Sequence, residues 1–361
     1  MPLFRFTRAG GLSRKARAHS PLPWIALIAL LLGSAALGFA WLAGWIGHRL
    51  TAQSFTDSIE ATGPAHPGFR RAHSKGVCVS GYFEGAPAGA ALSSARVFTQ
   101  PRVPVLGRLS IGGGDPHGAD NSARVRSIAL QLSSDDGQVW RMAMNSFPFF
   151  AVPTIEAFHE QTLAQTPDPA TGKPDPAKMA AVLEKYPSAR AFQQWARTAP
   201  WPDSWASTEY NSVNSFWFVA ADGQRRAVRW QWQPQTPLVA MDEATRQGAD
   251  ADFLSQDLQQ RLVAGPVRWN LVVTLAGPQD DVDDPSTPWP ASRQQVQAGV
   301  LTLQSMQSQE EGACGELNFD PLILPTGIER SNDAILAARS AVYSQSFNRR
   351  ERERARGQET R

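Results

Sequence analysis

The sequence predicts an α+β fold, in which helices surround an antiparallel β-barrel and one long apolar helix precedes it. Short segments rich in β-forming residues recur along the middle of the chain, and turns containing Gly, Asp, Pro and Ser separate them. Helical segments lie between two groups of these strands and again later in the chain. This order of elements is typical of one domain with an antiparallel barrel and helices packed outside it.

A basic segment followed by an apolar run opens the chain. Residues 1–20 contain five basic and no acidic side chains, and residues 21–47 carry no charge. A membrane-spanning helix needs about 20 apolar residues, whereas the core of a cleaved signal peptide needs about 7–15. The positive-inside rule places residues 1–20 in the cytoplasm. We therefore expect a single-pass anchor over 21–48 in a bacterial inner membrane, with the rest of the chain facing the periplasm; a cleaved signal is the alternative.

The expected strands and helices follow from local composition and periodicity. Strands are predicted over 76–84, 106–111, 126–132, 139–144, 212–220, 226–232, 269–275 and 299–303. Asp222 and Gly223 form a favoured hairpin turn between two of them. Helices are predicted over 54–61, 154–164, 176–198, 252–263 and 333–345.

Length and charge bound the organisation of the chain. Its 361 residues suffice for one large domain or two ordinary ones. We expect the folded domain to comprise 49–348. Residues 349–361 alternate Arg and Glu without an apolar period, which predicts a solvated, charged tail, Arg350 excepted. The formal net charge of +2 gives no sign of a nucleic-acid partner, and we expect none.

Two cysteines, Cys78 and Cys314, occur in the sequence. A disulfide would be compatible with an oxidising compartment such as the periplasm. The sequence does not bring the two residues together, however, and we predict two buried free thiols.

A tyrosine near the C-terminus has the surroundings of an activated phenol. In the stretch 339–343, Arg339 lies four residues before Tyr343, and residues four apart share one face of a helix. The cation favours the ionised phenol, and a phenolate is a hard anionic ligand for ferric haem. By itself the pattern is weak, since an exposed Arg beside a half-buried Tyr is an ordinary feature of helices.

A histidine near the other end of the chain gives this pattern a partner. His73 lies between Arg70 and Gly76, just before the first strong strand. Taken alone, one His of six is more often a structural residue than a catalyst.

Together these segments resemble the motifs of the haem catalases, in the order in which that family has them. Arg70, His73 and Gly76, followed by Gly-Tyr-Phe, resemble the distal-histidine motif R-x-x-H-A-x-G, with Ser74 in place of Ala. Further matches are Arg108-Leu109-Ser110 for R-F-S, Asn145-Ser146-Phe147-Pro148-Phe149-Phe150 for N-N-x-P-x-F-F, the aromatic Phe158, Asn318-Phe319-Asp320-Pro321, Pro325-Thr326-Gly327-Ile328-Glu329, Ser331-Asn332-Asp333, Arg339, Tyr343 and Arg350. The resemblance implies the catalase β-barrel and a haem b cofactor; the absence of a CxxCH motif excludes covalent c-type attachment.

The resemblance and the side-chain chemistry imply the same roles around the haem. Tyr343 is the expected axial ligand of the iron, with Arg339 beside it. His73 is the expected acid–base group, and Asn145 would orient the peroxide and stabilise charge on the leaving oxygen. Ser110 is expected to hydrogen-bond the other ring nitrogen of His73 and to fix its tautomer.

Four further residues are expected to contact the haem itself. Arg70, Arg108 and Arg350 would bind the propionates through their planar guanidinium groups, and Phe158 would stack on the porphyrin face. Without the resemblance, Asn145 is a turn residue before a proline, the arginines Arg108 and Arg350 are surface charges, and Phe158 is a core residue.

The chain also departs from a typical catalase. It lacks the long N-terminal arm that helps to lock the usual tetramer and the extra C-terminal helices, so we expect a homodimer in place of that tetramer. Ala72 replaces Val before the distal His, and Ser344-Gln345 replaces Pro-Asp after Tyr343. This pattern resembles the small bacterial catalase-related peroxidases.

The resulting functional prediction is a haem peroxidase. It would reduce hydrogen peroxide or organic hydroperoxides through a ferryl intermediate, with electrons from a small-molecule or membrane-associated donor. The alternatives are a compact catalase that dismutates hydrogen peroxide, and a haem carrier or sensor without turnover.

Overall fold

The computed structural model describes residues 21–43, 46 and 50–359. The predicted basic segment 1–20 lies outside them, as does part of the predicted span. The chain divides into two units, Met1–Thr51 and Ala52–Arg361. In the first, helix α1 (Leu22–Leu42) has 21 residues and no buried side chain. Its length and apolar composition are those of a membrane span or of a signal sequence.

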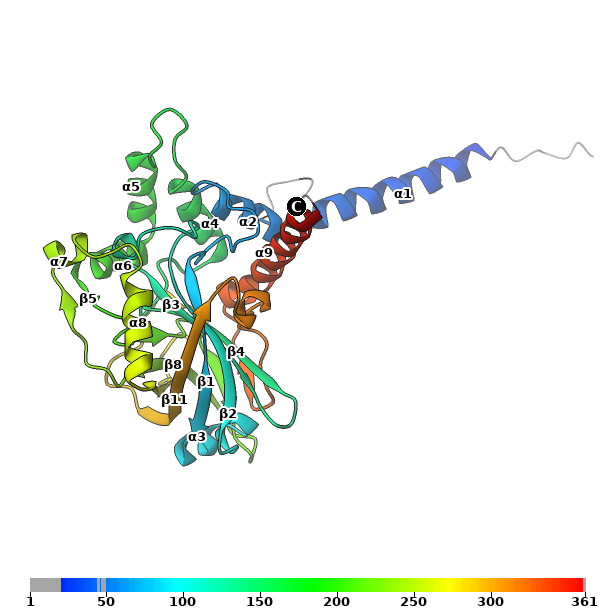
Figure 1. The fold of residues 1–361 in the computed structure, drawn as a ribbon. Helices are drawn as coiled ribbons and strands as arrows, with labels where there is room; N and C mark the ends of the chain where they lie inside the picture. The colour runs from blue at the N-terminus through cyan, green and yellow to red at the C-terminus, as the bar shows by residue number, and fades with distance from the viewer. Residues whose placement is uncertain (1–20, 44–45, 47–49, 360–361) are drawn as a thin grey trace, which may run out of the picture. The chain divides into compact units, whose positions relative to one another are not determined.

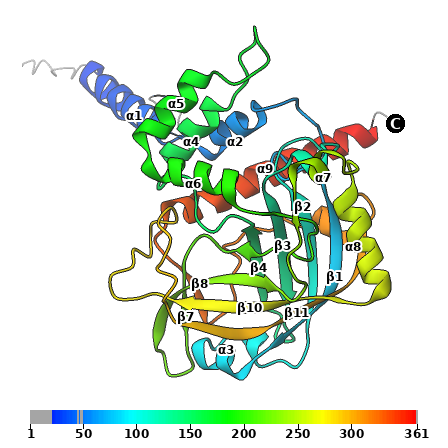
Figure 2. The same ribbon diagram turned by 90° about the vertical axis from the view of Figure 1, so that its left-hand side faces the viewer.

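A closed antiparallel β-barrel forms the centre of the second unit. Its hydrogen-bonded order is β10-β11-β1-β2-β3-β4-β6-β8, and β8 pairs back with β10 to close the ring (Figure 2). The barrel strands are β1 (Gly76–Gly85), β2 (Val103–Ile111), β3 (Arg126–Ser133), β4 (Val139–Asn145), β6 (Tyr210–Asn211), β8 (Arg225–Pro234), β10 (Val267–Leu275) and β11 (Gln295–Ser308). Beyond β8 the sheet continues into β7 (Phe216–Val219) and β12 (Ile328–Arg330). The predicted fold class is therefore confirmed.

Helices and short elements surround the barrel. In both views α2, α4 and α5 gather beyond one end of it, and α3 lies at the other end (Figures 1 and 2). The remaining elements are α2 (Ala52–Glu60), α3 (Pro87–Leu92), α4 (Ile155–Ala164), α5 (Pro176–Lys185), α6 (Pro187–Thr198), α7 (Glu243–Gln247), α8 (Phe253–Ala264), α9 (Ala334–Glu359), the short strands β5 (Trp201–Pro202) and β9 (Ala240–Met241), and the 3₁₀ turns η1 (Arg96–Phe98), η2 (Asp120–Ser122) and η3 (Ala313–Glu316).

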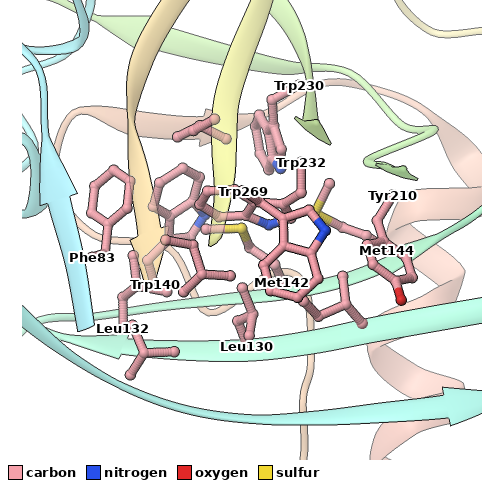
Figure 3. Packing of buried hydrophobic residues seen from close by; sticks show 14 of the residues in the cluster. Phe83, Leu130, Leu132, Trp140, Met142, Met144, Tyr210, Trp230, Trp232 and Trp269 are labelled. Carbon is pink, nitrogen blue, oxygen red and sulfur yellow. The ribbon is translucent and has the colours of Figure 1, made fainter. Parts of the chain in front are cut away.

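Large side chains fill the interior of the barrel. Trp140, Trp230, Trp232 and Trp269 are at most 3% exposed, and Figure 3 shows them packed with Met142 among aliphatic side chains. The rings of Trp140 and Trp230 meet edge to face with centroids 5.1 Å apart. Since the inward-facing residues of a small barrel occupy its whole interior, a ligand must bind outside this core.

Several predicted boundaries are wrong by more than two residues. The strands expected over 212–220 and 299–303 are the shorter β7 and the longer β11. The single helix expected over 176–198 is divided into α5 and α6 at Pro187, which lacks an N–H, and Tyr186 before it is extended with φ −119° and ψ 102°. The last predicted helix does not end at 345 but continues as α9 to Glu359.

The predicted solvated tail over 349–361 is wrong for its first residues, which pair with other elements. Arg350, which the resemblance had placed at the cofactor instead, is only 2% exposed. Arg349 forms ion pairs with Asp57 and Glu60 of α2, both at 2.5 Å, and Glu353 pairs with the buried Arg71. The charged residues of this segment therefore join α9 to α2 and to the loop before β1, which no local pattern in the sequence reveals.

The prediction of two free thiols is wrong as well. Cys78 on β1 and Cys314 in η3 form a disulfide across 236 residues of sequence. Both residues are nearly inaccessible, with exposures of 2% and 0%. The pairing depends on where η3 folds back over β1, which is a tertiary feature.

Candidate functional site

A cavity of about 480 Å³ lies outside the packed barrel core. Side chains from α2, the loop before β1, β2, β3, β4, α4 and α9 line it. The nine residues singled out from the sequence all belong to its lining: Arg70, His73, Arg108, Ser110, Asn145, Phe158, Arg339, Tyr343 and Arg350. Segments separated by more than 250 residues of sequence thus meet at one site.

Helix α9 presents Tyr343 and Arg339 to the cavity one helical turn apart. The Arg339 Nη2 donates to the Tyr343 phenol oxygen at 3.2 Å and to the carbonyl of Ala143 on β4 at 2.7 Å. The cation is thus fixed against the phenol by the barrel wall. The arrangement places a fixed cationic hydrogen-bond donor directly at the phenol oxygen.

A buried polar chain continues from Arg339. Its Nη1 donates to Asn214 Oδ1 at 2.5 Å, and Asn214 Nδ2 donates to Asp333 Oδ2 at 2.6 Å. Burial raises the pKa of Asp333. Val213, next to Asn214, has φ +63°, a left-handed conformation that is strained for a β-branched residue. The backbone is held in this conformation where it supports the position of Arg339.

On the loop before β1, His73 is held from two sides. Its φ is +53°, and its carbonyl accepts a hydrogen bond from Arg108 Nη1 at 2.7 Å. Burial, followed by the charges of Arg108 and Arg339, lowers the pKa of His73 to about 4. The imidazole is therefore neutral at neutral pH and can accept a proton.

The His73 ring contacts a different serine than the one predicted. Ser127 Oγ lies 3.0 Å from His73 Nδ1 and donates to Asn145 Oδ1 at 2.6 Å. Ser110 is the direct register partner of Ser127 on the neighbouring strand. The sequence motif placed a serine at the correct level of the barrel, but only the strand register identifies which one reaches the imidazole.

The three predicted propionate ligands form a buried cationic group. Burial lowers the pKa of Arg70, Arg108 and Arg350, and the neighbouring arginines lower it further; for Arg108 it falls to about 9. Within the described part of the chain, neither Arg70 nor Arg108 forms an ion pair with a carboxylate.

Their remaining hydrogen-bonding capacity points to an anionic ligand. Arg70 Nη2 donates to the carbonyls of Cys314 and Leu317, each at 3.0 Å. Arg108 Nε and Arg350 Nη2 are buried, and no partner among the described residues satisfies them. Unpaired buried donors on cations are costly, and a carboxylate-bearing ligand would satisfy both. This donor set fits the propionates of a haem.

Aromatic side chains make up much of the cavity wall. Phe158 on α4 contacts Phe55 on α2 and Phe150, with ring centroids 5.1 and 4.9 Å apart. Phe55 and Ile59 of α2 also line the cavity, and the sequence analysis missed both. Their spacing of four residues within the predicted helix 54–61 was the available signal, since it gives the helix one apolar face.

Comparison with known proteins agrees with this arrangement. The sequence model of the catalase family matches residues 65–355. A catalase-related peroxidase of Synechococcus elongatus is 38% identical over 331 residues, covering 91% of this chain and 97% of that protein. A catalase-related peroxidase of Mycolicibacterium paratuberculosis is 33% identical, covering 83% and 95%. Catalase-2 of Bacillus subtilis is 26% identical, and the alignment covers 76% of this chain but 43% of that longer protein. The chain therefore belongs to the catalase family and is an oxidoreductase that acts on peroxide.

Proposed function

We propose that the protein is a haem b peroxidase that reduces hydrogen peroxide or organic hydroperoxides with electrons from a small-molecule donor. The observation that carries the proposal is the cavity with Tyr343 and Arg339 on α9, the pair His73 and Asn145 on other elements, and arginines with unsatisfied buried donors. The resemblance to two proteins named catalase-related peroxidase over nearly their whole length supports peroxidation as the main reaction.

The residues present would hold a haem through three kinds of contact. Tyr343 would be the axial ligand, and Arg70, Arg108 and Arg350 would bind the propionates. Phe158 would pack against the porphyrin. When bound, the haem would supply the iron at which the peroxide is reduced and through which donor electrons pass.

The protein's own contribution to catalysis would be proton transfer and orientation. His73 is neutral and would take the proton from one peroxide oxygen and return it to the other as that oxygen leaves. Asn145 has no basic atom; its amide would donate a hydrogen bond to the leaving oxygen. Overall, one peroxide, two electrons and two protons would give water and an alcohol, or two waters for hydrogen peroxide. A protein that only carries haem has no use for this distal pair.

The same proposal includes location in the bacterial inner membrane. Helix α1 has the length and composition of a span, and the basic flank at 1–20 would remain in the cytoplasm. The buried Cys78–Cys314 disulfide supports a periplasmic domain, because disulfides persist in oxidising compartments. A membrane-associated donor would be within reach of such a domain.

One purification can test the chemistry. The detergent-solubilised protein should show the optical spectrum of Tyr-ligated ferric haem and should oxidise dye donors with peroxide far faster than it releases oxygen. Tyr343→Phe should abolish that spectrum, whereas Tyr82→Phe, which alters a tyrosine outside the cavity lining, should not. Oxygen release at the rate of donor oxidation or above would favour a catalase, and absence of peroxide reduction would leave a haem carrier.

A further inference from the structure

Ser127 lies between the two residues that would act on the peroxide. It is the second residue of β3. There it is the register partner of Ser110 on β2 and of Asn145 on β4. Its side chain is 7% exposed and lines the cavity. Ser127 therefore lies on the central one of three adjacent strands, and its hydroxyl is 3.0 Å from the Nδ1 atom of His73.

The hydrogen bonds of Ser127 determine where the protons lie. A serine hydroxyl has one proton, and in this structure Oγ donates it to Asn145 Oδ1, which can only accept. The contact of Oγ with His73 Nδ1 then requires the imidazole to be the donor. A neutral imidazole with its proton on Nδ1 has a lone pair on Nε2.

The same bonds orient the asparagine. Because Asn145 Oδ1 accepts the hydrogen bond from Ser127, the Nδ2 group of Asn145 faces other partners as a donor. One hydroxyl thus leaves an acceptor on His73 and a donor on Asn145. These are the two complementary groups that a hydroperoxide, which has both a proton and lone pairs, would require.

We propose that Ser127 is a positioning residue that keeps His73 in the Nδ1–H tautomer and fixes the amide of Asn145. This inference rests on the proposed function and extends it to a residue outside the recognised motifs. The backbone of His73 is already anchored through its carbonyl to Arg108, and the ring also hydrogen-bonds the backbone of Ile111. Ser127 adds the side-chain contact that links the orientation of the ring to Asn145.

Removal of the Ser127 hydroxyl should loosen the orientation of both His73 and Asn145 without affecting haem binding. In Ser127→Ala, cyanide affinity of the ferric protein and the rate constant for peroxide should each fall about 10- to 100-fold, as is typical when a group that orients a functional histidine is lost. The Soret spectrum and haem content should stay as in the parent. Ser80→Ala is the matched control, because Ser80 also bonds a side chain across two barrel strands but does not line the cavity.

A double-mutant cycle separates positioning from general damage. If Ser127 acts through His73, Ser127→Ala in a His73→Gln background should change cyanide affinity by less than twofold, because the effects of coupled residues are not additive. A Ser127→Ala protein with parental cyanide affinity and peroxide rate would overturn the proposal, as would an undiminished loss in the His73→Gln background. A parent protein that binds haem without reducing peroxide would instead refute the proposed function.

Discussion

The disulfide between Cys78 and Cys314 gives a sharp test of how the site is held together. Replacement of both residues by alanine removes a cross-link that closes a loop of 236 residues. The loop-entropy relation assigns about 5 kcal/mol to a loop of this length, and measured values are typically 2–4 kcal/mol. We therefore expect the double variant to lose about 2–5 kcal/mol in the free energy of unfolding.

This loss corresponds to a measurable change in melting temperature. The unit Ala52–Arg361 is expected to have an unfolding entropy of about 0.65 kcal/mol/K, so its melting temperature should fall by about 3–8 °C. Unfolding followed by circular dichroism in urea and on heating provides both quantities. The parent protein in a mild reductant is the control, and it should keep its stability, because both cysteines are almost fully buried.

The disulfide should also influence the cavity. The Cys314 carbonyl accepts a hydrogen bond from Arg70, and the disulfide joins η3, which contains Cys314, to Cys78 of β1. We expect the double variant to release haem faster than the parent does. An unchanged urea midpoint together with an unchanged rate of haem loss would refute the reasoning that this cross-link holds Arg70 in place.

Three further predictions address the other features. The rate constant for peroxide should stay level as the pH falls from 7 to about 5 and decline only near pH 4, because His73 accepts a proton only above its pKa of about 4; stopped-flow spectroscopy would detect a decline centred near 6.5 if this were wrong. Glu353→Gln removes the ion pair with buried Arg71 and should cost about 1–3 kcal/mol in urea unfolding, whereas a solvated tail would give no change. Asn214→Ala leaves Asp333 without its amide donor and should destabilise the protein by about 1–3 kcal/mol. It should also shift the Soret band, and an unchanged spectrum would show that the hydrogen bonds joining Asp333, Asn214 and Arg339 do not influence the haem.

Local sequence was sufficient for most of the fold. The β-rich segments that become β1, β3, β4 and β10 differ from their predicted ranges by one or two residues at most, and the turn at Asp222 and Gly223 has the expected positive φ of +83° at Gly223. Such features depend on neighbours within a few residues. The break at Pro187 was also encoded locally, since proline removes a helical hydrogen bond, but the periodicity on either side concealed it.

The candidate site divides in the same way. Short motifs in a fixed order identified His73, Asn145, Arg339 and Tyr343, because each motif combines functional groups with spacings that the local backbone fixes. Ser127 has no such motif. Its proposed role follows from its position opposite Asn145 across β3 and β4, which strand register determines, and from its contact with His73, which depends on how the loop before β1 folds.

By itself, the sequence indicated the side chains of the candidate site: an arginine one turn from a tyrosine, a histidine in a basic loop and an asparagine after a strand. Tertiary structure alone decided their partners. The cystine pairing, the contact between Ser127 and His73, and the ion pairs of Arg349 with α2 each join segments that are far apart in the chain. A contact between two distant residues leaves no signal in the periodicity or composition of the surrounding sequence. Its energy is gained only once the barrel and α9 have packed together.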